Sequence, residues 1–182
     1  LDVSANTALQ DINLDYNQLV SLDVSNNTAL RSLGCQDNEL TTFDVSNNTE
    51  LTVLRCLQNE ITTLDVSNNT ALTTLDCSSN DITSLDVSLN TALTLLNVEG
   101  NQLTTLDVSN NTNLDELYCQ NNQLTSLNVS NNPLLTGLGL FDCQINNIDL
   151  TNNIYLSSVN LAHNNLSSLD VSNLSDLSFL NL

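Results

Sequence analysis

Five cysteines are the residues of this sequence best suited to chemistry, because a thiolate can attack a substrate, bind a metal or form a disulfide. Four of them recur at multiples of 21 residues, namely Cys35, Cys56, Cys77 and Cys119. The same spacing brings Val98, Leu140 and Leu161 to this position, so the position accepts any apolar residue of moderate size. Since free cysteine packs as a small hydrophobe, we expect buried free thiols here. A disulfide between neighbouring copies and a metal site are the alternatives.

Aspartates form a second series with chemical potential, inside the recurring segment Leu-Asp-Val-Ser. The series includes Asp23, Asp44, Asp65, Asp86 and Asp107. Carboxylates stacked in register repel one another unless hydrogen bonds or cations offset the repulsion. The Ser and Asn amides that follow favour an Asx-turn, and Asn128 replaces Asp in one copy, which suits a hydrogen-bonding role. Ca²⁺ held by this oxygen ladder is the alternative.

Catalytic patterns are absent from the sequence. His163 is the single histidine, and no nucleophile, phosphate-binding glycine loop or paired metal-ligand motif accompanies it. Carboxylate pairs such as Glu99 and Glu116 arise by chance in so acidic a chain. We therefore expect a protein that is not an enzyme and needs no cofactor.

All of these residues belong to a 21-residue unit, LxxLxCxxNxLxxLDVSNNTA, which repeats without insertion or deletion. Eight full copies begin at residues 9, 30, 51, 72, 93, 114, 135 and 156, with partial copies at both ends, so we expect one domain over 1–182. With the first Leu of each copy numbered 0, apolar residues fall at positions 0, 3, 5, 10, 13 and 15. Each half of the unit alternates apolar and other residues and then ends in an Asn-bearing turn. The pattern predicts a β-rich solenoid with two short parallel strands per 21-residue coil, two facing sheets and little or no helix.

Asparagines recur at two positions of the unit, and an amide side chain can pair with turn backbone groups that strands leave free. Position 8 holds Asn17, Asn38, Asn59, Asn80, Asn101, Asn122 and Asn164, and position 18 holds Asn6, Asn27, Asn48, Asn69, Asn90, Asn111, Asn132 and Asn153. We expect both ladders to be structural. Cys143 takes position 8 in one copy.

The unit resembles the leucine-rich repeat, whose signature LxxLxLxxN/CxL has a period of roughly 20–29 residues. Its 21-residue form, with Leu-Asp-Val in the second half, is similar to the short bacterial class sometimes called IRREKO repeats. The resemblance covers essentially the whole chain. It implies a curved stack of parallel strands whose concave sheet, built from the first half of each unit, serves recognition.

Variation concentrates at positions 1, 2, 4, 6 and 7, which the resemblance places on or beside the concave sheet. Two groups of unusual residues are expected to bind a ligand there: Arg31, Val53, Arg55 and Leu57 form one, and Leu95, Asn97, Glu99, Glu116, Tyr118, Gln120, Phe141 and Asp142 form the other. Because exposed arginine and aromatic residues favour interfaces, a protein partner is expected. A glycan stacked on Tyr118 and Phe141 is the alternative, and a structural spacer is the third hypothesis.

The charge of the chain limits its partners. Two arginines and no lysine stand against 21 acidic residues, a net charge of −19, which repels nucleic acid and anionic membranes. No apolar run is long enough to span a bilayer. Such acidity suits a secreted or surface protein, so we expect an extracellular or cell-surface bacterial location. Neither end carries a recognisable cap, so we expect either a longer parent chain or end-to-end association of uncapped coils.

Overall fold

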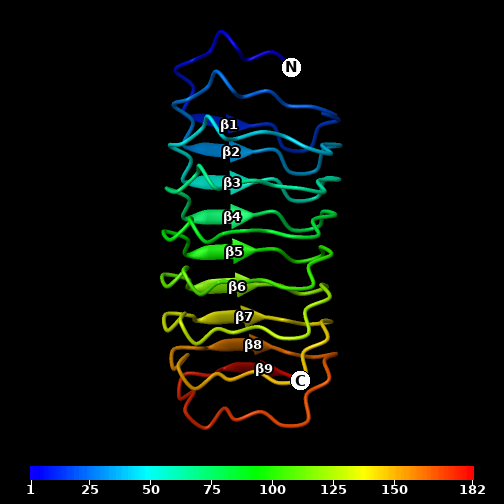
Figure 1. Cartoon of the computed structure of the whole chain (residues 1–182), viewed down its shortest axis with the longest axis vertical. Coiled ribbons are helices and arrows are strands. Elements are labelled where there is room, and N and C mark those ends of the chain that lie inside the picture. Colours follow the sequence, from blue (N-terminus) through cyan, green and yellow to red (C-terminus); the bar gives the residue numbers. More distant parts are fainter.

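A single parallel sheet runs the length of the molecule in the computed structural model, which describes residues 1–182. Nine strands of three residues each, one per coil, pair in chain order (Figure 1). They are β1 (Asp11–Asn13), β2 (Ser32–Gly34), β3 (Val53–Arg55), β4 (Thr74–Asp76), β5 (Leu95–Asn97), β6 (Glu116–Tyr118), β7 (Gly137–Gly139), β8 (Ser158–Asn160) and β9 (Phe179–Asn181). The expected solenoid of parallel strands without helix is confirmed.

Each strand residue pairs with the residue one full repeat away in the neighbouring strand, so the period of the sequence sets the register of the sheet. Leu33 pairs with Leu54, and Leu54 with Leu75. This central residue points into the core, while its two neighbours in the strand point outward, because side chains alternate along a strand. No helix of the length and apolar character needed to cross a membrane is present.

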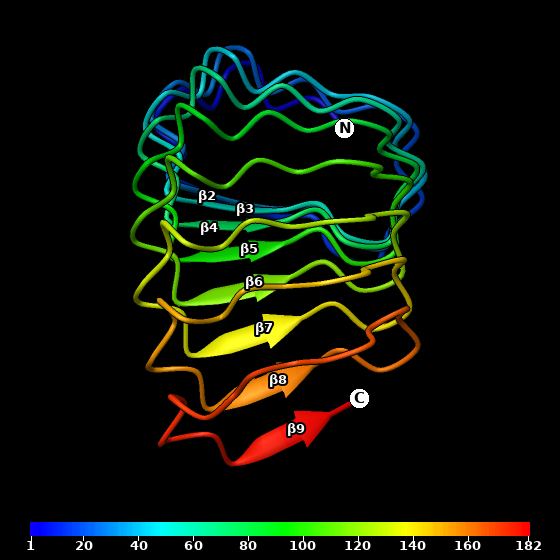
Figure 2. The ribbon, with the colours of Figure 1, turned by 60° about the horizontal axis from the view of Figure 1, so that its bottom comes forward.

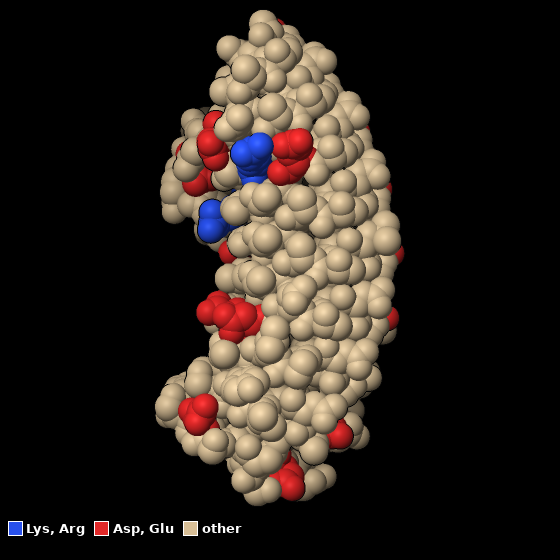
Figure 3. Space-filling view, turned by 90° about the vertical axis from the view of Figure 1, so that its left-hand side faces the viewer, with Lys and Arg blue, Asp and Glu red and all other residues tan.

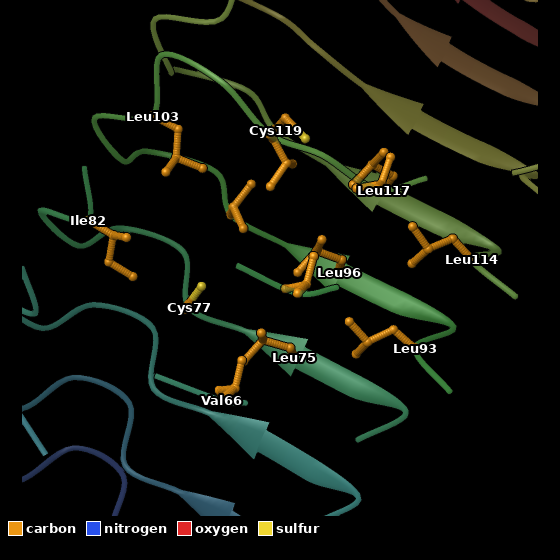
Figure 4. Packing of buried hydrophobic residues seen from close by; sticks show 14 of the residues in the cluster. Val66, Leu75, Cys77, Ile82, Leu93, Leu96, Leu103, Leu114, Leu117 and Cys119 are labelled. Carbon is orange, nitrogen blue, oxygen red and sulfur yellow. The ribbon is translucent and has the colours of Figure 1, made fainter. Parts of the chain in front are cut away.

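The core consists of the six predicted apolar columns, to which Cys143 at position 8 and Leu174 at position 18 are added. Forty-one buried residues form one continuous cluster, so no coil has a core of its own. In Figure 4, Leu75, Leu96 and Leu117 from successive strands point into the same interior, beside Cys77 and Cys119. Each buried leucine contributes about 1.5–3 kcal/mol before chain entropy is subtracted. A coil is therefore stable only when it is stacked on its neighbours.

The prediction of a second strand in each coil, and of a second sheet, is wrong. The second halves of the coils form one isolated bridge, between Asp23 and Asp44. Figure 2 shows flattened coils with strands along one long side only, and Figure 3 shows a crescent. On the outer arc of a crescent the coils lie further apart than at the inner sheet, where backbone ladders need about 4.8 Å.

Side-chain amides take over the role of the missing ladder on the outer arc. Asn48 Nδ2 donates to Val24 O at 3.0 Å and to Asn27 O at 2.9 Å, so the longer reach of an amide joins two coils. The same two bonds recur along the position-18 ladder, and the amide oxygens of seven of these asparagines have no partner. The structural role predicted for this ladder is confirmed.

The position-8 ladder holds the edge of the sheet in the same way. Asn80 Oδ1 accepts the Ile61 N–H of the preceding coil at 3.0 Å. Its Nδ2 donates to the carbonyl oxygens of Cys56, Cys77 and Ser78, each at 3.1 Å. Position 7, just before this asparagine, has a left-handed backbone in eight coils, with φ between 52° and 63°. The sequence reasoning did not identify this conformation.

Candidate functional site

The inner face of the crescent is formed by the residues on either side of each buried strand centre. Figure 3 shows this hollow side, where arginine and acidic side chains gather, while further acidic side chains dot the outer edge. Most of the residues expected to bind a ligand lie on this face, either within β2 to β7 or directly beside those strands. They occupy two areas of this face, one around β3 and one from β5 to the turn after β7.

Val53 and Arg55 in β3 form the centre of the first area. Val53 is half-buried and Arg55 is exposed. Arg55 pairs in register with Gly34, which has no side chain, and with Asp76 on the other side. Leu57, two residues after Arg55, is half-buried. An exposed guanidinium thus lies among partly exposed aliphatic side chains.

Arg31 is the one arginine in an ion pair. Its Nη2 lies 3.4 Å from Glu50 Oε2, and both side chains are more than half exposed. An exposed pair of this kind contributes little to stability. Arg55 forms no ion pair, so its charge is free to meet a partner without breaking a bond.

The second area is built around β7, where both outward positions are glycine. Gly137 and Gly139 are buried, because side chains of the preceding coil lie over them. A Cβ atom added to Gly137 would lie 3.3 Å from Tyr118 Oη, and one added to Gly139 would lie 2.6 Å from the Gln120 amide. The glycines are therefore needed to let Tyr118 and Gln120 lie flat on the sheet. The pKa of Tyr118 is raised, mainly by partial burial and to a smaller extent by the nearby Glu116 carboxylate. Its hydroxyl is therefore protonated at neutral pH.

Polar residues of β5 and its turn are partly engaged in internal hydrogen bonds. Asn97 Nδ2 donates to Asp76 Oδ2 at 3.3 Å, and Asn97 Oδ1 accepts the Glu99 N–H at 3.1 Å. The Glu99 carboxylate accepts a long bond of 3.5 Å from Asn121 Nδ2. Leu95, half-buried, pairs in register with Glu116. These residues line the sheet between Arg55 and Tyr118.

Phe141 and Asp142 lie at the far edge of the second area. The ring of Phe141 lies 4.8 Å from the His163 ring of the next coil, at an interplanar angle of 39°. Asp142 is exposed and has a φ of 52°, so it serves the left-handed turn. The structure thus gives Phe141 an aromatic partner that the sequence grouping did not include.

The five cysteines are buried free thiols, as expected. Burial raises the pKa of Cys35 and of Cys77 to about 12, so neither is a nucleophile at neutral pH. Cys143 Sγ donates to Cys119 O at 3.3 Å. It replaces the equivalent asparagine bond, which in Asn122 is 2.9 Å long.

The aspartate series forms Asx-turns. Asp65 Oδ1 accepts the Ser67 N–H at 2.9 Å, and Asn128 Oδ1 makes the equivalent bond to the Ser130 N–H at 3.0 Å. Hydrogen bonds from Ser67 lower the pKa of Asp65. The pKa values of the other aspartates in the column are lowered in the same way, by the serine or threonine two residues later. No group of three or more His, Cys, Asp or Glu side chains is placed to hold a metal ion. These hydrogen bonds are the ones expected of the capping role.

Sequence reasoning missed exposed apolar residues outside the concave sheet. Leu134, Ile154 and Tyr155 lie in the turns that lead into β7 and β8, and each is about half exposed. The second half of the unit is therefore less uniform than the sequence reasoning assumed. The available signal was the loss of the recurring Thr-Ala pair at the end of the unit.

Comparisons with known proteins agree with the geometry. A family model described as the LVIVD repeat matches residues 33–55 and 96–118, while no curated protein matches the chain. The functional domain of InlJ from Listeria monocytogenes, described as including a cysteine ladder, is similar, with a TM-score of 0.79 and 38% identity over 96% of this chain and 44% of that one. A leucine-rich-repeat protein from Leptospira interrogans has a TM-score of 0.91 and 22% identity over 96% of this chain and 49% of that one. Internalin C2 from Listeria monocytogenes has a TM-score of 0.90 and 24% identity over 98% of this chain and 84% of that one.

The chain spans about half the length of the first two of these structures, at 44% and 49%. Their likeness extends over nearly all of this chain, and the repeat register seen in the sheet is the one that the sequence pattern predicts. We conclude that the chain is a leucine-rich-repeat protein built on the 21-residue form of the repeat.

Proposed function

We propose that the chain is a recognition module that binds a protein partner through its concave sheet. The observation that carries this proposal is Arg55, an exposed and unpaired arginine between the half-buried aliphatic side chains of Val53 and Leu57. Arginine is enriched among the few residues that carry most of the binding energy at protein interfaces. The similarity to the functional domain of InlJ supports this assignment.

The second area supplies a flat apolar anchor on the same face. Tyr118 lies over Gly137 and is half-buried, with Glu116 beside it and Gln120 over Gly139. A partner that spans both areas would cover the sheet from β3 to β7. At about 4.8 Å per strand this is roughly 20 Å, a span that suits a folded protein surface better than a small molecule.

We also propose that the module is non-catalytic and works in a secreted or cell-surface protein. The buried thiols support the first statement, because their raised pKa values keep them protonated. The net charge of −19 supports the second, since strongly acidic surfaces suit a saline extracellular medium.

The test is a binding screen of the intact chain against arrays of extracellular proteins and of glycans. Each hit is repeated with Arg55→Ala, with Tyr118→Ala and with Thr83→Ala, a control on an exposed second-half turn. We expect a protein hit that is lost with Arg55→Ala and kept with Thr83→Ala, at unchanged melting temperature. A glycan hit that is lost with Tyr118→Ala would replace the proposal with carbohydrate binding, and silence on both arrays would favour a spacer.

A further inference from the structure

The turns that precede β7 and β8 depart from the rest of the molecule. Position 19 is threonine in the partial first copy and in the first five full copies, as in Thr91 and Thr112, and then becomes Pro133 and Ile154. Position 20 is alanine or a polar residue except in these two copies, where it is Leu134 and Tyr155. Two consecutive coils have thus exchanged a small polar pair for a bulky apolar pair at the same place.

The stacking of the coils brings the two apolar pairs side by side. Gly137 and Ser158, which follow them, pair in register, and the Ser157 N–H donates to Thr136 O at 2.9 Å. The exposed fractions are 47% for Leu134 and 52% for Tyr155. Adjacent half-exposed side chains of this size form an apolar patch, and such a patch lowers solubility unless something covers it.

Proline is accepted at this turn without loss of a hydrogen bond. The equivalent amides of Thr91 and Thr112 donate no backbone hydrogen bond, so the missing N–H of Pro133 leaves no acceptor unpaired. The fixed φ of proline also reduces the freedom of the turn. The patch is therefore presented on a rigid edge of the solenoid.

Carboxylates border the patch on both sides. Asp115 Oδ1 accepts a hydrogen bond from Thr136 Oγ1, which places this carboxylate next to the turn of Leu134. On the other side, Asp176 occupies position 20 of the next coil, the position that Tyr155 occupies in its own coil. The Arg31–Glu50 pair at 3.4 Å shows that a side chain at position 20 reaches position 1 of its own coil, and Leu134 and Asp115 stand in that same relation.

We propose that Pro133, Leu134, Ile154 and Tyr155 form a second docking surface, for a protein segment with an apolar side chain flanked by lysine or arginine. The charge selects this occupant, because two carboxylates edge the patch and both arginines of the chain lie at least three coils away. A second copy of the chain would bring the same carboxylates and another net charge of −19 against the first. This surface lies on the turn edge and is separate from the concave sheet, so it goes beyond the function proposed above.

The test uses three fluorescent peptides: leucine and tryptophan flanked by lysines, the same core flanked by glutamates, and the lysine frame with glycine as its core. The main variant carries Pro133→Thr, Leu134→Ala, Ile154→Thr and Tyr155→Ala, which restores the repeat and leaves the net charge unchanged. Leu89→Asn is the matched control, because Leu89 is 56% exposed on another turn and asparagine is the usual residue there. Thermal melting checks that each variant folds.

Fluorescence anisotropy is expected to show binding of the lysine-flanked apolar peptide only. Its Kd should rise at least tenfold in the restored variant and stay unchanged with Leu89→Asn. Asp115→Asn should weaken binding several-fold and reduce its dependence on salt. Equal binding by the restored variant would overturn the proposal, since it would show non-specific attraction to an acidic protein. Self-association, or binding to phosphatidylcholine vesicles, that disappears in the restored variant would also overturn it, in favour of a second copy or a membrane surface.

Discussion

Asn80 gives the sharpest test of the position-8 ladder, because it makes four hydrogen bonds in a site that is 7% exposed. Replacing it with alanine leaves the N–H of Ile61, a fully buried residue, without an acceptor. An unpaired buried donor costs about 1–3 kcal/mol, and each of the two lost amide protons contributes about 1 kcal/mol. We therefore expect Asn80→Ala to lower the free energy of unfolding by about 4 kcal/mol.

Asn17→Ala is the matched control within the same ladder. Asn17 is exposed and makes two amide bonds within its own turn, to Leu14 O at 2.9 Å and to Asp15 O at 3.0 Å. Its Oδ1 joins no second coil, so no buried donor is left unpaired on substitution. The loss expected for Asn17→Ala is below about 1 kcal/mol.

Urea denaturation followed by circular dichroism measures both values. With a slope of about 3 kcal/mol per M, Asn80→Ala should lower the midpoint by more than about 1 M, and Asn17→Ala by less than about 0.3 M. Amide hydrogen exchange adds a local measurement, in which the Ile61 amide should lose protection selectively. Equal midpoint shifts for the two variants, with Ile61 still protected, would refute the ladder as a link between coils.

Three further predictions concern the turns. Cys143→Asn should raise the free energy of unfolding by about 1 kcal/mol in a urea titration, because an amide restores the stronger bonds that the other coils make at this position. A variant in which Asp65 and the other aspartates of its column are all replaced by asparagine should lose much of the fall in melting temperature that the unmodified protein shows below pH 3.8. The lowered pKa of each folded aspartate contributes stability above the unfolded value of 3.8, and this stability is lost as the pH falls through the folded value. Gln58→Gly should stabilise the protein by up to about 1 kcal/mol and Gly100→Ala should destabilise it by a similar amount, since both residues have a left-handed φ, 54° and 63°. Differential scanning calorimetry measures both.

Each of these has a result that would contradict it. Unchanged stability of Cys143→Asn would show that the thiol bond to Cys119 O equals an amide bond. If the variant with asparagine throughout the column still unfolded steeply in acid, other carboxylates would be responsible for acid unfolding. A Cβ atom added to Gly100 would meet its nearest neighbour at 3.5 Å, an ordinary contact, so the left-handed backbone is the only expected source of destabilisation. Stabilisation by Gly100→Ala would therefore show that this backbone conformation carries no cost.

Most of the fold follows from the period of the sequence. The register of the sheet, the six apolar columns and the burial of Cys35, Cys56, Cys77 and Cys119 were predictable, because each depends only on which residues recur every 21 positions. The second strand was not. Leu-Asp-Val alternates as a strand does, yet it lies on the outer arc, and curvature is a property of the whole stack.

The candidate site follows the same division. The sequence placed Arg55 and Tyr118 at variable positions of the concave face, since position in the repeat determines face. It did not show that Arg31 is paired and Arg55 free, or that Tyr118 lies over Gly137, because these depend on which neighbour in the next coil is large, small or charged.

The sequence by itself determined the repeat, the inward and outward faces and the turn chemistry of asparagine and aspartate, because these are local consequences of side-chain type and spacing. Only the tertiary structure decided the curvature, the single sheet and the neighbours across coils. Stacking sets Leu134 beside Tyr155, residues that are 21 apart in the chain, and no local pattern records which side chains become adjacent when coils are stacked.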